Sequence, residues 1–274
     1  YMNAALKSII GDIDLTSYTY MEVLFDKGTG PGLADQTFQL KMYLKIAYEL
    51  GLILILPKRN LSMKHNNGVS IPLIFSDYYD INSIKVSGNS VDVVTSIPDH
   101  QPDIGLEPCY DLTLQIDALV RPFPDLDLDY EVTIEPCTTH MKFAREFVDS
   151  NKISGCVHIR RTDRCRGGHH VFGGISGPDW DIANRPKNII SMLDNTIAPG
   201  NIYIMTDMSS DDPIIEDLRK QKKYNFMFLY DFPELIEIKN ENNYKVYSIE
   251  SCIMAITSYK KHKGNVVKYY LQNK

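Results

Sequence analysis

The six residues from His158 to Asp163, read as HIRRTD, carry the side chains best suited to chemistry in this sequence. They follow an apolar, strand-like segment, and strand alternation sends His158 and Arg160 to one face of a sheet and Arg161 to the other. Arginine offers a planar fork of donors that matches phosphate oxygens, and its charge does not titrate away. The pattern predicts a diphosphate-binding site with His158 beside it as a base or a ribose ligand. The alternative is a surface strand end whose arginines pair with Asp163 and nearby acids.

The composition is typical of a soluble globular protein, with 43% hydrophobic and 23% charged residues. A net charge of -6 gives no electrostatic support to nucleic-acid binding. No apolar run approaches the roughly 18 residues that span a membrane, and the first residues lack the pattern of a signal peptide. The five cysteines lie far apart with no CxxC pair, which is typical of a reduced protein. We therefore expect a cytoplasmic protein with no membrane span and no nucleic-acid partner, and the sequence leaves its oligomeric state open.

The elements that must position the arginines follow an α/β pattern. In the first half, a strand over Tyr18–Phe25 leads into the glycine-rich turn Gly28–Gly32 and a helix over Leu33–Leu50, which carries an apolar stripe at 3.6-residue spacing. Gly51 ends this helix, and Leu52–Leu56 reads as a buried strand. This strand–turn–helix–strand unit puts the glycines where a phosphate would bind.

The second half alternates helices and strands after Thr139. The expected elements are a helix through Phe143, Ala144, Phe147 and Val148, a strand over Gly155–Arg160, a helix from Pro186, a strand over Ile202–Met205, a helix opened by Asp212-Pro213, a strand over Phe226–Tyr230, and a helix through Val246, Ile249, Ile253 and Ile256.

The middle of the chain, about Asn60 to Pro136, has a weaker pattern. It predicts a short strand over Val91–Val94 and a helix near Leu112–Val120. The acidic stretch Pro122–Asp129 reads as a solvated loop or a connection between lobes, with metal binding as the alternative.

The alternation of strands and helices in both halves predicts an α/β fold of two Rossmann-like lobes, over residues 1–138 and 139–274. Ligands in such parallel sheets bind at the carboxyl ends of the strands. The loops at 26–32 and 160–170 both leave such ends, so both are candidate ligand-binding segments.

The glycine-rich turn has two interpretations. Gly28, Gly30 and Gly32 let backbone N–H groups approach a phosphate at the start of the following helix, or they only reverse the chain. Their spacing, GxGxG, differs from the dinucleotide fingerprint GxGxxG. The next strand ends in Lys58-Arg59, where an NAD-binding protein carries an acid for the ribose. NAD binding is therefore not expected, whereas NADP binding through Arg59 stays open as an alternative.

A set of thiols and imidazoles raises the question of zinc: Cys156, His158, Cys165, His169 and His170. Their spacing matches no usual ligand pattern, and Cys156 points to the same face as His158 rather than closing a tetrahedral site with it. We therefore predict no metal, and a buried core position for Cys156.

Three motifs in a fixed order carry a resemblance to a known family. The segment His158–Asp163 is similar to the motif HxRRxD. Upstream, Gly30-Pro-Gly32-Leu-Ala-Asp35-Gln36, the helix after it and Leu52–Pro57 resemble an opening "GGxxNQ … helix … LVLP". Downstream, Ile202–Asp207 resembles a "VYxATD" strand. Together they resemble the GDP-fucose-dependent fucosyltransferases, which include the core α-1,6-fucosyltransferase, the protein O-fucosyltransferases and the nodulation-type enzymes.

The resemblance implies a GT-B architecture, with the acceptor mainly on the first lobe and the donor nucleotide on the second. It implies inverting, metal-independent transfer of a sugar from GDP-β-L-fucose, or a related GDP-sugar, to an acceptor hydroxyl on a glycan or another molecule, with no further cofactor. In this family pattern Arg160 would hold the β-phosphate, and His158 and Asp207 would lie near the guanosine.

The remaining donor-binding residues are also implied by the resemblance. Gly30 and Gly32 would donate backbone N–H groups to the diphosphate, and Asp163 would orient the arginines. Gln36 and Arg161 belong to the same motifs and complete the expected set.

The sequence departs from the family pattern in several places. Asp35 stands where the family usually carries Asn, and it is a candidate helix cap. Gly168 stands where the core-fucosylating branch has its glutamate base. His169 and His170 follow directly and are candidate bases, because imidazole near its ordinary pKa suits proton abstraction from a hydroxyl. An exposed loop is the alternative for this histidine pair. Further candidates are Asp12, Asp14, Asp179 and Asp181 for the base and Ser248 or Ser251 for the family's serine pair.

Two other functions stay open on the sequence. The missing glutamate fits a catalytically inactive module that binds a sugar nucleotide or a phosphate. An NADP-dependent oxidoreductase on two Rossmann-like lobes is the other alternative.

Overall fold

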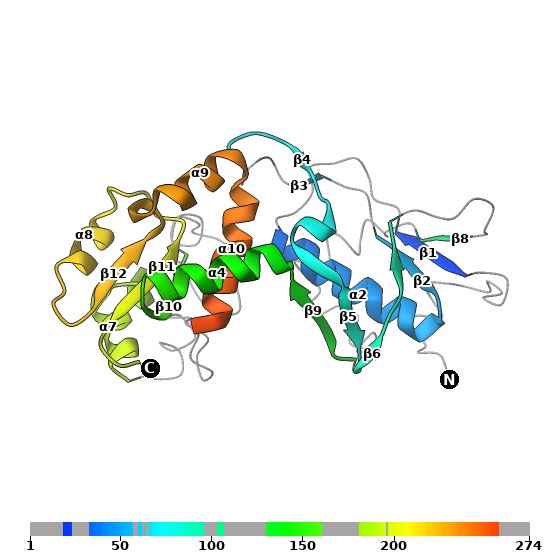
Figure 1. Cartoon of the computed structure of the whole chain (residues 1–274), viewed down its shortest axis with the longest axis horizontal. Helices are drawn as coiled ribbons and strands as arrows, with labels where there is room; N and C mark the ends of the chain where they lie inside the picture. Colours follow the sequence, from blue (N-terminus) through cyan, green and yellow to red (C-terminus); the bar gives the residue numbers. More distant parts are fainter. Residues whose placement is uncertain are drawn as a thin grey trace. The chain divides into compact units, whose positions relative to one another are not determined.

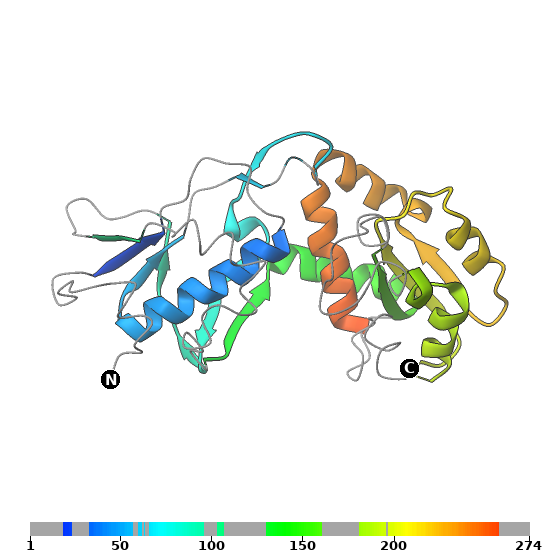
Figure 2. The ribbon, with the colours of Figure 1, turned by 180° about the vertical axis from the view of Figure 1, so that it is seen from behind.

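The computed structural model describes residues 19–23, 33–56, 60–61, 63, 66–95, 103–106, 130–160, 181–195 and 197–257. The chain divides into two compact units, Tyr1–Cys137 and Thr138–Lys274, and each contains a parallel sheet flanked by helices (Figures 1 and 2). This is a mixed α/β structure, as the sequence predicts. None of the helices in these described ranges combines the length and the apolar content that a bilayer span requires.

The parallel sheet of the first unit has the strand order β7-β2-β1-β8. Its neighbouring strands all run parallel. The strands are β1 (Tyr20–Val23), β2 (Ile53–Ile55), β7 (Val93–Val94) and β8 (Asp103–Leu106), and helix α2 (Leu33–Leu50) connects β1 to β2. The predicted strand–helix–strand opening is therefore confirmed, while the strand expected over Val91–Val94 is shorter, because only Val93 and Val94 pair with β2.

Helix α2 ends at a glycine with left-handed backbone. Gly51 has φ 68°, a conformation that side chains with a Cβ rarely adopt. The N–H of Gly51 donates to the Tyr48 carbonyl at 3.2 Å, and the N–H of Leu52 donates to the Ala47 carbonyl at 2.9 Å. This pair of bonds is a Schellman motif, which satisfies the last carbonyls of the helix and turns the chain directly into β2.

A second, antiparallel sheet in the first unit lies against α2. It has the order β6-β5-β9 and consists of β5 (Tyr79–Val86), β6 (Asn89–Ser90) and β9 (Val132–Pro136). Helix α2 contacts β5 and β9 as well as β2. Tyr48 joins the helix to this sheet region by two contacts: its hydroxyl accepts a hydrogen bond from Asn89 at 2.8 Å, and its ring meets that of Tyr130 edge-on at 5.2 Å.

The weak pattern of the middle segment did not predict this sheet. Strand β5 alternates poorly because Asp80, Asn82 and Ser83 occupy its first half, and only Ile84 and Val86 in it are buried. Smaller elements near it are β3 (Asn60–Leu61), paired with β4 (Ile71–Pro72), and the 3-10 turn η3 (Phe75–Asp77). The predicted helix near Leu112–Val120 and the acidic stretch Pro122–Asp129 lie outside the described residues.

The second unit is built on the parallel sheet β10-β11-β12. Its strands are β10 (Ile153–Ile159), β11 (Asn201–Thr206) and β12 (Asn225–Phe228), and its helices are α4 (Thr138–Ser150), α7 (Pro186–Asp194), α8 (Pro213–Arg219), α9 (Pro233–Glu241) and α10 (Asn243–Thr257). Helices α7 and α8 cover one face of the sheet, and α4 and α10 cover the other (Figures 1 and 2).

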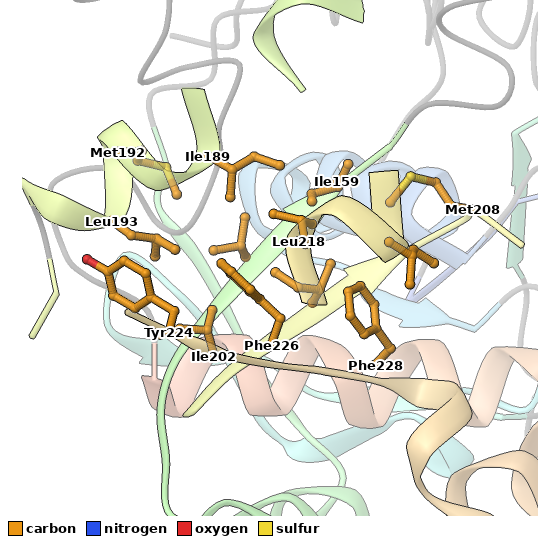
Figure 3. Packing of buried hydrophobic residues seen from close by; sticks show 13 residues of the cluster. Ile159, Ile189, Met192, Leu193, Ile202, Met208, Leu218, Tyr224, Phe226 and Phe228 are labelled. Carbon is orange, nitrogen blue, oxygen red and sulfur yellow. The ribbon is translucent and has the colours of Figure 1, made fainter. Parts of the chain in front are cut away.

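Two apolar clusters hold these layers together. Figure 3 shows the cluster on the α7 and α8 side, where Val157 and Ile159 of β10 pack with residues such as Ile189 and Phe228. On the α4 and α10 side, Cys156 packs in a cluster with Tyr203, Phe147 and Ile253. The alternation that the sequence predicts for β10 is therefore confirmed over its last residues.

Local signals explain where several helices of this unit begin. Asp212 caps α8, because its Oδ1 accepts the N–H of Ile214 at 2.9 Å and Pro213 takes the first helical position. Pro186 likewise takes the first helical position of α7. Both starts agree with the sequence prediction.

The sequence prediction differs from the structure at the end of β12 and in the helix that follows it. The strand expected over Phe226–Tyr230 ends at Phe228, because Leu229–Asp231 form the 3-10 turn η5, in which Asp231 Oδ2 accepts the N–H of Phe228 at 2.8 Å. Helix α9 follows this turn and was not predicted. The expected final helix through Val246, Ile249, Ile253 and Ile256 is confirmed as α10; the first three are buried and Ile256 is 38% exposed.

Candidate functional site

The candidate site lies at the carboxyl ends of β10 and β11. These strands run parallel, with Ile159 paired to Thr206, so Arg160 and Asp207 follow side by side at the same edge of the sheet. His158 is paired with Met205, one step before this edge. In open α/β sheets, ligands bind outside the carboxyl ends of the strands. Three of the predicted donor-binding residues are thus brought together by strand register.

His158 is largely buried and lies in electrostatic reach of the other two side chains. Burial lowers the pKa of its imidazole below the ordinary 6.5, the positive charge of Arg160 lowers it further, and the carboxylate of Asp207 opposes both. The neutral imidazole is therefore favoured at neutral pH. A neutral imidazole donates one hydrogen bond and accepts another, which suits a ribose or a base more than a phosphate.

Arg160 supplies the permanent positive charge at this edge. It is half-buried, whereas Asp207 is exposed. A guanidinium keeps its charge at any physiological pH and presents donors in a plane, so the edge combines a cation for an anionic ligand with a carboxylate that accepts hydrogen bonds from hydroxyl or N–H groups.

The turn after β11 is held by Tyr230, a residue of η5. The N–H of Met208 donates to Thr206 Oγ1 at 3.1 Å, and the hydroxyl of Tyr230, in η5, donates to the Met208 carbonyl. The pKa of Tyr230 is raised by burial and by the carboxylates of Glu250, Asp207 and Asp211. The strand ends of β11 and β12 are therefore joined at the candidate site.

A buried acid of α10 contacts β11 within the core of this unit. Glu250 is only 6% exposed and accepts a hydrogen bond from the Tyr203 hydroxyl at 2.8 Å. Burial raises the pKa of Glu250 to about 7, although the bond from Tyr203 and the charge of Lys239 oppose this rise. Glu250 and Tyr230 were missed by sequence reasoning. The only sequence signal for Glu250 is its position as a charged residue between Ile249 and Ile253 of the apolar stripe.

Cys156 and Asp181, two residues singled out in the sequence, have a buried position and an ion pair in the structure. Cys156 is fully buried, as predicted for a core cysteine, and burial together with Glu250 raises the pKa of its thiol. Asp181, a candidate base, forms an ion pair with Arg185 at 3.3 Å.

The two candidate serines differ in exposure. Ser248 is buried, with its Oγ hydrogen-bonded to His140 Nδ1 at 2.9 Å. Ser251 is exposed and donates to the Tyr247 carbonyl at 2.8 Å. The first bond joins α10 to α4, and the second lies within α10.

The other predicted donor-binding residues and candidate bases belong to the first unit or lie outside the described residues. Gln36 is buried on α2 in the first unit, at 1% exposure. Several predictions fall outside the described residues: Gly30, Gly32, Arg161, Asp163, Gly168, His169, His170, Asp12, Asp14 and Asp179, together with the side chain of Asp35. Among the described residues, no group of three or more His, Cys, Asp or Glu side chains is arranged to hold a metal ion.

Comparison with known proteins gave no match, either to a protein-family model or to a curated protein. Function is therefore inferred from the residues at the strand ends and from the motifs that contain them.

Proposed function

We propose that this protein is a glycosyltransferase of GT-B type that moves L-fucose, or a related sugar, from a GDP-sugar to an acceptor hydroxyl. A glycan is the proposed acceptor. The proposal includes inversion at the sugar, no metal requirement, two Rossmann-like lobes and a cytoplasmic location. The observation that carries it is the meeting of Arg160, His158 and Asp207 at the carboxyl ends of two paired parallel strands. The three motifs that resemble the fucosyltransferases support the choice of donor.

Arg160 has the central role in this mechanism. The acceptor oxygen attacks the anomeric carbon, the bond from that carbon to the diphosphate oxygen breaks, and GDP leaves with the electron pair. A fixed guanidinium beside the β-phosphate stabilises the negative charge that develops on the leaving group. Removing one such contact costs on the order of 10²–10³ in rate.

His158 and Asp207 fit the nucleoside part of the donor. The neutral imidazole of His158 can both donate and accept, and the carboxylate of Asp207 accepts from ribose hydroxyls or from the N–H groups of guanine. The acceptor hydroxyl must lose its proton to a base, and His169 or His170 is proposed for this step on the sequence pattern alone.

A sugar-nucleotide-binding module without transferase activity is the second candidate function. It is favoured by Gly168, which stands where the core-fucosylating branch carries its glutamate. Binding of GDP-fucose without release of GDP, in the presence of glycan acceptors, would identify this function.

The donor site is tested by thermal unfolding with GDP, GDP-fucose, UDP, ADP and NADP. A ligand at 100 times its dissociation constant adds about 2.7 kcal/mol to the free energy of unfolding. We expect a rise in melting temperature with GDP and GDP-fucose only, and its loss in Arg160→Ala. The matched control is Arg145→Ala, which removes an exposed arginine of α4 in the same unit and should keep the response.

Other ligand responses would contradict the proposal. No shift with any guanosine nucleotide would rule out the GDP-sugar donor. A shift with NADP alone would favour the oxidoreductase instead.

A further inference from the structure

The pair Asn67-Gly68 forms the centre of a tight turn in the first unit. The N–H of Val69 donates to the Asn66 carbonyl at 2.9 Å, which closes a four-residue β-turn. Both central residues have left-handed backbone, with φ 52° at Asn67 and φ 80° at Gly68. Positive φ at both central positions is the signature of a type I′ turn, in which asparagine followed by glycine is strongly preferred. The backbone of the turn therefore explains why these two residues stand there.

The same pair is chemically labile. The backbone nitrogen of the residue after an asparagine can attack the side-chain carbon Cγ and close a five-membered ring, and glycine hinders this attack least because it has no Cβ. Asn67-Gly68 is the only Asn-Gly pair in the sequence, and both residues are exposed. A Cβ added at Gly68 would meet no described atom within 4 Å, so the turn is open to solvent on that side.

Three hydrogen bonds hold the closed turn back from this reaction. The first is the Val69–Asn66 bond that closes the turn, and in the second the N–H of Gly68 donates to the Met63 carbonyl at 3.1 Å. The attacking nitrogen must lose this proton, so the second bond opposes the attack directly. In the third, Nδ2 of Asn66, a residue that is only 4% exposed, donates to the Val69 carbonyl at 3.1 Å. Ring closure also requires rotation about the Cα–C and Cα–Cβ bonds of Asn67, so the turn must open first.

We propose that Asn67 is a site of spontaneous deamidation, and that opening of the turn Asn66–Val69 sets its rate. In the opened turn, the Gly68 nitrogen loses its proton to a base in the solvent and attacks Asn67 Cγ. The bond from Cγ to the side-chain nitrogen breaks, and that nitrogen takes up a proton and leaves as ammonia. Water then opens the cyclic imide at either of its carbonyls, which gives aspartate or isoaspartate. The net reaction adds one water and releases one ammonia, and it is independent of the proposed function.

The two products have different consequences for the neighbouring strands. Aspartate keeps the length of the main chain and tolerates left-handed backbone, so it adds only a negative charge. In isoaspartate the main chain runs through Cβ, which lengthens the connection between β3 and β4. This pair of strands joins Leu61, which is 1% exposed, to Ile71. We therefore expect isoaspartate to weaken the β3–β4 pair and aspartate to preserve it.

The test is peptide mapping by mass spectrometry after the whole chain has been kept at mildly alkaline pH, either folded or in urea. In urea, Asn67 should convert faster than Asn89, which is followed by serine, and Gly68→Ala should slow this conversion because the added Cβ hinders the nitrogen. In the folded protein, conversion at Asn67 should be slower on the order of 10- to 100-fold, because opening breaks three hydrogen bonds.

A variant of the turn tests its control over the rate. Asn66→Ala removes the bond to the Val69 carbonyl and should speed conversion in the folded protein by on the order of 5-fold. The matched control is Asn82→Ala, the same substitution at an exposed position of β5, which should leave the rate at Asn67 unchanged. Circular dichroism checks that both variants are folded, and if Asn66→Ala is not, the comparison of folded and unfolded wild type decides.

Conversion at Asn67 in urea that is no faster than at Asn89 would overturn the assignment of the site. Equal conversion in the folded and unfolded wild type, or an unchanged rate in folded Asn66→Ala, would overturn the control by the turn.

Discussion

Replacing Glu250 by glutamine should stabilise the protein above neutral pH and leave its stability unchanged in acid. The pKa of Glu250 rises from an ordinary 4.5 to about 7, mainly through burial. The folded state therefore keeps a proton that the unfolded state releases between these two pH values. The favourable contribution of that proton is complete below about pH 4.5 and is lost as pH rises through about 7.

The size of this effect follows from the change in pKa. Each unit of difference between the folded-state and unfolded-state pKa corresponds to about 1.36 kcal/mol. Between pH 4.5 and pH 8, the contribution of Glu250 to the wild-type free energy of unfolding therefore falls by on the order of 3 kcal/mol. Glutamine has nearly the same shape, and its oxygen can still accept the Tyr203 hydroxyl, which lies 2.8 Å from Glu250 Oε1. The variant avoids the cost of a buried charge without opening a cavity.

Urea unfolding followed by circular dichroism across this pH range measures the difference directly. The control is Glu237→Gln, which makes the same substitution at an exposed position of α9. The reasoning about Glu250 is refuted if the stability difference between Glu250→Gln and wild type stays constant from acid to alkaline pH.

Two local predictions concern helix ends. Asp212→Ala removes the acceptor of the Ile214 N–H and should lower the free energy of unfolding by about 1 kcal/mol. Asp212→Ser keeps a side-chain cap and should lower it less. Equal losses of the two variants in urea unfolding would argue against the cap. Gly51→Ala should cost about 1 kcal/mol through its φ of 68° alone, since a Cβ there meets nothing within 4 Å. Gly51→Asn should cost less, because asparagine tolerates left-handed backbone, and the reverse order would contradict this explanation.

Much of the second unit was predictable because its signals are local. The pair Asp212-Pro213 favours a helix start without help from distant residues. The apolar residues of β10 and β11 favour strands buried on both faces. In the first unit, the same locality explains why α2 and its end at Gly51 were found. Strand β5 was missed because its polar first half gains stability only from pairing with β9, about fifty residues later.

The candidate site was predictable only in part, for a related reason. Arg160 was singled out because a charged residue ends an apolar strand, which is visible in the sequence itself. That Asp207 lies beside it depends on the register of β10 with β11. Tyr230 contacts the turn after β11 through the packing of η5, and no spacing rule connects positions so far apart in the chain.

The two sheets of the first unit are interleaved along the chain, and this affects how the units acquire structure. The parallel sheet uses strands before and after β5 and β6, and its β1–β8 pair joins Met21 to Ile104. The antiparallel sheet closes only when β9 arrives, near residue 132. The parallel sheet therefore cannot be completed by a growing chain before β8, which ends at Leu106, and the antiparallel sheet cannot be completed before β9, which ends at Pro136. The second unit adds β10, β11 and β12 in sequence order, each beside the last. Its helical layer does not follow this order, because the His140–Ser248 bond that joins α4 to α10 spans 108 residues, so α4 reaches its final packing only after α10 has been synthesised.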